Sequence, residues 1–263
     1  MKRLLAGFCV ALALSAQAAD PVAFVADLKG NATIEGDGKL AFLAELVPGT
    51  RLLLGTGASV AVTYATSGNE FTIVGPGEFV VTATEIRADR GAKPARRSIM
   101  ALQNAGVVSS ASKTATASLR MRGLTTQSAA KPALEYPVNA RIATLQPTLR
   151  WQGDGTASVM DVQGKEVWKG SANRPPIKLA PATAYTWTVM TPKGPLGEAR
   201  FETLSAEAIA RAEKSRASAR NFSDRVMHAF VLQDLGATQD ARDAWAALAR
   251  ERPDLPELAA LAR

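Results

Sequence analysis

Few side chains in this sequence have the types and spacing that catalysis or metal binding would need. His228 is the single histidine and Cys9 the single cysteine, so neither the usual structural zinc sets nor a Cys–His nucleophile pair can be built. His228 lies among apolar residues in a helical pattern, where we expect a packed structural histidine rather than a base. The stretch Ser110-Ala-Ser-Lys113 matches S-x-x-K, but the S-D-N and K-T-G partners of that motif are missing. Paired carboxylates stay open, because any two acids can meet in a folded chain. We therefore predict no enzyme, with no catalytic residue, no cofactor and no metal site.

Two glycine pairs raise the question of a phosphate-binding loop. They are Gly55-Thr-Gly57 and Gly75-Pro-Gly77, within "RLLLGTGASVAVTYATSGNEFTIVGPGEFVV". A dinucleotide fingerprint needs a third glycine and a helix start, but Val60 takes that place and an alternating, β-branched strand pattern follows. A Walker loop is also missing, because Gly38-Lys39 is followed by leucine. Both pairs are best interpreted as turns between short strands.

Residues 1–19 have the pattern of a secretory signal peptide. Two cations precede an apolar run that ends in Ser15-Ala-Gln-Ala-Ala19, with cleavage expected after Ala18 or Ala19. The run is shorter than the roughly 20 residues that span a bilayer. Cys9 follows Phe8 instead of the small residue that lipidation requires, so we expect it to leave with the signal. The prediction is a periplasmic chain with no transmembrane segment after signal cleavage and no disulfide.

Charge is unevenly distributed along the chain. The formal net charge is +7, and residues 87–131 hold nine cations against the single anion Asp89. This stretch is rich in Ala, Ser and Thr, so residues 88–131 are predicted to form a basic linker, in which the alternation near Thr114–Leu119 allows one strand. We expect it to be either a solvated connector or a binding site for an anionic envelope polymer or an acidic partner. Nucleic acid is excluded as a partner because no aromatic side chain is there to stack on bases.

Residues 20–87 predict a β-roll or β-sandwich of short strands. The order of turns and strands is similar to that of the FecR-type periplasmic domain. The residues that match the motif positions of that domain are Gly30, Gly49, Gly55, Ser59, Gly68, Gly75 and Pro76. The resemblance covers about 65 residues and implies a non-catalytic interaction module. FecR regulators also carry a cytoplasmic anti-sigma segment and a membrane helix before this domain. This sequence shows neither, so transmembrane signalling is not implied.

Residues 132–204 predict a second sandwich. Tyr185, Trp187 and Val189 alternate with polar residues, and Gln163-Gly164 is a turn candidate between two strand patterns. The phrase "LAPATAYTWTV" closely resembles the fibronectin type III and related immunoglobulin-like sandwich, through Leu179, Pro181, Tyr185 and Trp187, with Trp151 as an earlier core tryptophan. Alternation at this spacing favours a core over a sugar platform. Trp168, at a hairpin end, is the best candidate for an exposed aromatic.

Residues 205–263 predict helices. Ser205 is a candidate N-cap, Gly236 closes the second helix, and Pro253 ends the third. The stretch 222–255 resembles one tetratricopeptide unit through Ala229, Gly236, Ala241, Trp245 and Pro253, but Thr238 and Leu248 depart from that pattern. A single repeat cannot bury its own apolar face. This tail therefore either packs inside the protein or forms a docking groove.

The predicted protein is mainly β, with a β-roll or sandwich, a fibronectin type III-like sandwich and a C-terminal α-helical hairpin. Its expected function is non-catalytic binding or scaffolding in the cell envelope, with protein partners engaged through the β-domains and the helical tail. The alternative is binding of an envelope glycan or peptidoglycan through the basic linker and exposed aromatics. The candidate partner or glycan contacts are Arg96, Arg97, Arg120, Arg122, Trp168 and Trp245.

Overall fold

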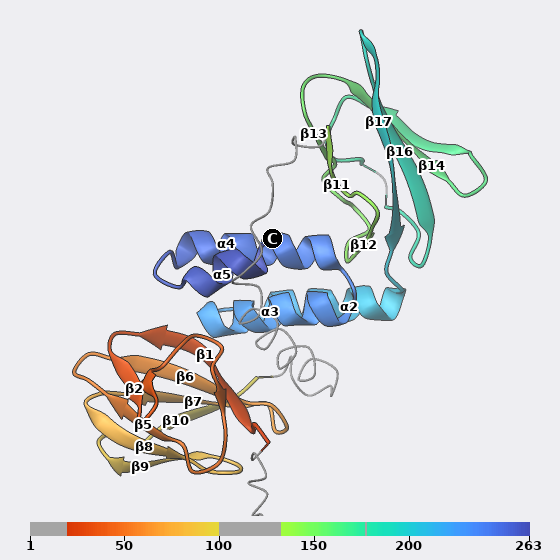
Figure 1. The fold of residues 1–263 in the computed structure, drawn as a ribbon. Helices are drawn as coiled ribbons and strands as arrows, with labels where there is room; N and C mark the ends of the chain where they lie inside the picture. The colour runs from red at the N-terminus through yellow and green to blue at the C-terminus, as the bar shows by residue number, and fades with distance from the viewer. Residues whose placement is uncertain (1–19, 100–132, 177) are drawn as a thin grey trace, which may run out of the picture.

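A computed structural model describes residues 20–99, 133–176 and 178–263. These residues form a mainly β protein with a C-terminal helical region, which confirms the predicted fold class. We call residues 20–99 β-domain 1, residues 133–204 β-domain 2 and residues 205–263 the helical region. Figure 1 shows the helical region lying between the two β-domains.

β-domain 1 is built from two five-stranded sheets. One sheet has the order β10-β7-β6-β1-β4, with β1 (Ala23–Lys29), β4 (Glu45–Leu46), β6 (Ser59–Tyr64), β7 (Asn69–Val74) and β10 (Ala95–Ser98). The other has the order β3-β2-β5-β8-β9, with β2 (Ala32–Ile34), β3 (Gly38–Lys39), β5 (Arg51–Leu54), β8 (Gly77–Val81) and β9 (Ile86–Arg90). Residues from both sheets, including Val25, Leu52, Val62 and Phe79, share one buried apolar cluster.

The two glycine pairs are turns, as the sequence predicted. The backbone N–H of Gly75 donates to the carbonyl oxygen of Ala58 at 2.8 Å, so the two turns lie against each other. A side chain at position 75 would place its Cβ 2.1 Å from the carbonyl oxygen of Gly55. Glycine is therefore required for close packing of the backbone, and strand β6, not a helix, follows the first pair.

The predicted boundary between β-domain 1 and the basic linker lies too early in the chain. Residues 86–98 form β9 and β10, which pair with β8 and β7. The excess of cations indicated a linker, because the local sequence does not show that these arginines face acids on neighbouring strands. Arg90 pairs with Glu78 at 3.3 Å and Arg97 pairs with Glu70 at 2.6 Å. The rest of the predicted linker, with its candidate strand near Thr114–Leu119, lies outside the described residues.

β-domain 2 consists of a two-stranded and a five-stranded sheet. The first pairs β11 (Leu134–Tyr136) with β13 (Arg150–Trp151). The second has the order β12-β17-β16-β14-β15, with β12 (Ala140–Ile142), β14 (Thr156–Asp161), β15 (Glu166–Gly170), β16 (Ala184–Thr191) and β17 (Gly194–Thr203). We call this five-stranded sheet the large sheet of β-domain 2. Trp187 is fully buried, and its ring N–H donates to the carbonyl oxygen of Pro137 at 2.7 Å. The Tyr185 hydroxyl accepts a hydrogen bond from the N–H of Ala180 at 2.9 Å.

The helical region contains α2 (Ala206–Ser218), α3 (Phe222–Asp234), α4 (Thr238–Glu251) and α5 (Pro256–Leu261). The side chain of Ser205 accepts from the N–H of Ala208, which confirms the predicted N-cap. Asn221 and Asp224 form a capping box at the start of α3. Gly236 follows α3 with a φ of 78°, a conformation in which glycine costs least. The short helix α5 was not predicted.

The helical region packs on both β-domains. Val226, Phe230 and Trp245 belong to one buried cluster with Phe24, Phe42, Leu43 and Ile99 of β-domain 1. The ring of Phe230 meets that of Phe24 edge-on at 6.1 Å and that of Trp245 at 5.1 Å. A second cluster joins Leu232 and Ala241 to Leu204 and to Leu145 of β-domain 2. The apolar face of the tail therefore packs inside the protein, which is one of the two roles that the sequence left open.

Candidate functional site

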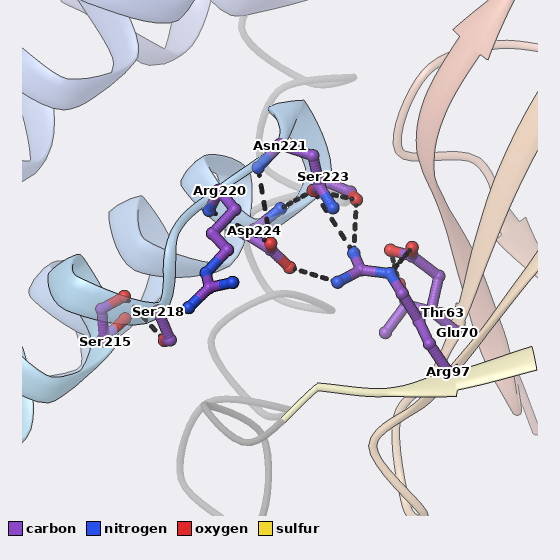
Figure 2. A network of polar contacts seen from close by, with 9 residues as sticks. All are labelled: Thr63, Glu70, Arg97, Ser215, Ser218, Arg220, Asn221, Ser223 and Asp224. Atoms are coloured by element: carbon purple, nitrogen blue, oxygen red, sulfur yellow. Dashed lines mark hydrogen bonds and ion pairs between the residues drawn. The ribbon is translucent and has the colours of Figure 1, made fainter.

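Arg97 connects β-domain 1 to the start of α3. Its Nε donates to Glu70 at 2.6 Å, and its Nη1 donates to Asp224 at 2.7 Å. Its Nη2 also donates to Ser223 at 2.9 Å and to Asn221 at 3.3 Å. Figure 2 shows the guanidinium reaching from β10 to the first turn of α3. A planar guanidinium with five donors suits this multidentate contact, which a lysine could not reproduce.

The charges in this network compensate one another in a poorly solvated place. The side chain of Glu70 is only 2% exposed, whereas that of Arg97 is 35% exposed. Burial opposes the charge on Arg97, but the hydrogen bonds and attraction of Glu70 and Asp224 outweigh it and raise the pKa of Arg97. The network is thus a charge-assisted joint between β-domain 1 and α3, in which the charged groups bind one another.

A second arginine joins the end of α4 to β-domain 1. Arg252 donates to Asp27 at 2.6 Å and to Asp254 at 2.8 Å, and its guanidinium lies 5.2 Å from the centre of the Phe222 ring. Hydrogen bonding to Asp254 is the largest of the effects that raise the pKa of Arg252. Arg97 and Arg252 therefore join the helical region to β-domain 1 at two separate points.

Asp240, in the first turn of α4, joins the helical region to β-domain 2. One carboxylate oxygen accepts from the hydroxyl of Tyr136 at 2.5 Å, and the other accepts from the N–H of Ala143 at 2.7 Å. Burial raises the pKa of Tyr136 and is also the largest effect raising the pKa of Asp240. Nearby, Arg150 pairs with Asp243 at 2.7 Å.

A cleft of about 610 Å³ lies at this second junction. Tyr136, the loop 143–148, Arg150, Arg174 and Lys178 line it from β-domain 2. The helices contribute apolar residues such as Leu232. They also contribute the polar and charged side chains of Glu213, Arg216, His228, Asp240 and Asp243. The cleft is thus formed jointly by β-domain 2 and by the three longer helices.

His228 is half-buried at the wall of this cleft. Its Nδ1 lies 3.3 Å from the hydroxyl oxygen of the buried Ser215. Burial, reinforced by the positive charge of Arg216, lowers the pKa of His228 to about 4, so the ring is neutral at physiological pH. Among the described residues no carboxylate is hydrogen-bonded to the second ring nitrogen, so this Ser–His contact lacks the orienting group of a catalytic triad.

Of the six sequence-predicted contact residues, the four that the structure describes do not form one site. Arg97 lies in the joint with α3, while Arg96 beside it is exposed and donates to Asn69 at 3.2 Å. Trp245 of α4 is fully buried and packs against Phe230 of α3. Trp168 faces the core side of β15, half-buried, with its ring against Gly170. Arg120 and Arg122 lie outside the described residues.

Sequence reasoning missed the cleft. Its cations come from β13, from the loop before β16 and from α2, so no local spacing brings them together. Of the residues that line the cleft, His228 was singled out from the sequence and was interpreted as a structural histidine because its neighbours along the helix are apolar. A search for basic residues in neighbouring loops would not have found the site, because its cations come from three segments that are far apart in the sequence.

Comparisons with models of protein families, with curated proteins and with solved structures find no match to this chain. The resemblances to a FecR-type domain, a fibronectin type III-like sandwich and a tetratricopeptide unit therefore stay predictions. Within residues 20–99, 133–176 and 178–263, no group of three or more His, Cys, Asp or Glu side chains is placed to hold a metal ion. No helix among these residues has both the length and the hydropathy that a membrane span requires.

Proposed function

We propose that this chain is a non-catalytic binding or scaffold protein of the cell envelope, exported to the periplasm, in which the helical region holds two β-domains in a fixed relation. The packing of the helical region on both sides supports this proposal. Its apolar residues are shared with β-domain 1 in one cluster and with β-domain 2 in another. A rigid pair of β-domains is suited to presenting two surfaces at a set distance.

The outer face of the large sheet of β-domain 2 is the partner surface in this proposal. Met160, Thr186 and Arg200 lie in one cross-strand row on that face. They border a hollow of about 460 Å³ together with Val162, whose side chain is 65% exposed. Met190, on the same face of β16, is 55% exposed. Exposed apolar side chains beside a hollow are features of protein-binding surfaces.

The glycan alternative draws less support from the described residues. An aromatic platform needs exposed rings, and the large apolar side chains that are exposed in the described ranges are Val74, Val162 and Met190. Trp168, the best sequence candidate, is half-buried in the core of β-domain 2. Residues 100–132 hold no aromatic side chain either, so the sequence of the basic linker adds no ring to such a platform.

Capture of envelope proteins by the purified full chain tests the proposal. We expect Val162→Asp and Met190→Asp each to reduce the recovery of specific partners at least fivefold, because a charge in an apolar contact must be desolvated. Val74→Asp, on an exposed strand position of β-domain 1, is the matched control and should leave recovery unchanged. Circular dichroism and the urea midpoint must show that all three variants are folded. Equal recovery by all three variants would contradict the assignment of this surface.

A further inference from the structure

We propose that the cleft between β-domain 2 and the helical region binds a small organic anion that carries two or more carboxylate or phosphate groups. This inference concerns a different surface from the outer sheet face above, and it does not depend on a protein partner. It rests on three observations: the charges that line the cleft, the hydrogen bonds that its polar groups make, and its shape.

The charge balance of the cleft leaves positive groups without partners. Four cations line it, namely Arg150, Arg174, Lys178 and Arg216, together with three acids, Glu213, Asp240 and Asp243. Arg150 is paired with Asp243. Among the residues that the structure describes, no carboxylate lies within ion-pair distance of Arg174, Lys178 or Arg216. Three unpaired cations thus face the cleft from two separate parts of the protein.

The acids that remain do not cancel this charge. Both oxygens of Asp240 are engaged, one by the Tyr136 hydroxyl and the other by the Ala143 N–H. Only Glu213 is left, on the exposed side of α2. The three cations lie at separate places around the cleft, and each can contact an anionic group of its own, so an anion with two or more such groups fits best.

Neutral hydrogen-bonding groups complete the lining. His228 is uncharged at neutral pH, and when the Ser215 hydroxyl donates to its Nδ1, the proton is on Nε2 and is available as a donor. Thr144 and Thr148 add hydroxyl groups from the β12–β13 loop. Such groups bind oxyanions together with arginine, whose fork accommodates two oxygens at once.

The shape of the cleft sets the size of the ligand. Its volume of about 610 Å³ falls in the range of small-molecule sites. Leu145, Ala212, Leu232 and Ala244 contribute apolar surface to the same lining. A low-dielectric floor strengthens the interaction of the cations with a bound anion. We therefore expect a compact organic acid or phosphate, and not an extended polymer.

Binding of this kind would also strengthen the junction between β-domain 2 and the helical region, because each of the two contributes cations to the cleft. Arg174 and Lys178 come from β-domain 2, and Arg216 comes from α2. A ligand that contacts both stabilises the assembled form over any form in which the junction is open. The midpoint of thermal unfolding should therefore rise with anion concentration.

The test is calorimetric titration of the full-length protein with citrate and, separately, with pyrophosphate, at low and at high salt. We expect saturable binding of at least one anion, weakened by salt, with the preferred anion showing whether carboxylate or phosphate is the natural group. Arg216→Gln and Arg174→Gln should each weaken binding about tenfold, the effect of losing a hydrogen bond to a charged group. Lys214→Gln, on the same helix but outside the cleft, removes the same charge and should change affinity less than twofold.

Three outcomes would overturn the proposal: no binding of either anion, binding that Arg216→Gln and Arg174→Gln leave unchanged, or an equal loss in Lys214→Gln. The rise in thermal midpoint provides an independent readout and should disappear in the two cleft variants. Since the titration contains no protein partner, its result is separate from that of the capture experiment with Val162→Asp.

Discussion

Arg97 on β10 and Asp224 on α3, 127 positions apart in the sequence, form an ion pair of 2.7 Å. The same guanidinium neutralises the buried carboxylate of Glu70. A residue that the sequence placed in a basic linker is therefore a joint between β-domain 1 and the helical region. This relationship explains why the helical region does not act as a separate tail.

Replacement of Arg97 with glutamine should destabilise the protein by about 2–3 kcal/mol. The change leaves Glu70, which is 2% exposed, without its counter-charge. Breaking a buried ion pair typically costs ~3–5 kcal/mol, and the partial exposure of Arg97 reduces that figure. Urea unfolding measures the difference. Arg96→Gln is the control, because its exposed side chain only donates to Asn69, and it should stay within ~0.5 kcal/mol of the parent.

Trp245→Ala should cost about 3–5 kcal/mol of stability, because it removes a fully buried ring from the cluster shared with β-domain 1. The ring N–H of Trp245 has no hydrogen-bond partner within the described residues, so Trp245→Phe should be milder than Trp245→Ala. Trp168→Ala, at a half-buried edge position, should cost about 1–2 kcal/mol. If Trp245→Ala were as stable as the parent, the packing described for the helical region would be incorrect.

Asp240→Ala should loosen the junction with β-domain 2. It removes the acceptor of both the Tyr136 hydroxyl and the Ala143 N–H. The loss of two hydrogen bonds to a buried carboxylate is expected to cost about 2–3 kcal/mol. Hydrogen exchange of the Ala143 amide should become at least tenfold faster. Asp243→Ala removes only an exposed pair with Arg150 and should cost less than ~1 kcal/mol. Equal protection of the Ala143 amide in both variants would show that Asp240 does not hold the junction.

His228 should make the protein less stable in acid. Its folded pKa is lowered to about 4 by burial and by Arg216, from an ordinary value of 6.5. The unfolded state therefore binds more protons between these values, so the free energy of unfolding falls as the pH drops from 6.5 towards 4 and is unaffected above that range. His228→Gln should lack this component. We expect the parent to lose about 2 kcal/mol more than the variant between pH 7 and pH 5, measured by urea titration at each pH. Parallel pH profiles would rule out this role.

Local features of the chain were predictable because they depend on residues a few positions apart. Ser205 caps α2 through the N–H of Ala208. Gly164 lies in the turn between β14 and β15 with a positive φ. The buried side of β16 follows from the alternation of Tyr185, Trp187 and Val189. In each case a hydrogen bond or a side-chain period within one element determines the outcome.

The candidate site was not predictable in the same way. The end of β9 and all of β10 were assigned to a linker because the stretch is basic and rich in Ala, Ser and Thr. Only strand pairing brings Glu78 and Glu70 beside its arginines. The cleft brings together Arg174 and Arg216, which are far apart in sequence and lie in different parts of the fold. Pattern analysis within a window cannot detect charges that meet only after the domains dock.

By itself, the sequence determined most of the strands and the three longer helices, the glycine turns, the Ser205 cap and the small number of side chains able to do chemistry. Those features follow from backbone sterics and from the periodicity of apolar residues. Tertiary structure alone decided that the apolar face of the helices is buried between two β-domains and that Arg97, Arg252 and Asp240 serve as joints. It also decided that three cations with no ion-pair partner among the described residues line one cleft. The reason is physical: burial and charge pairing depend on distances in space, which the order of residues along the chain does not specify.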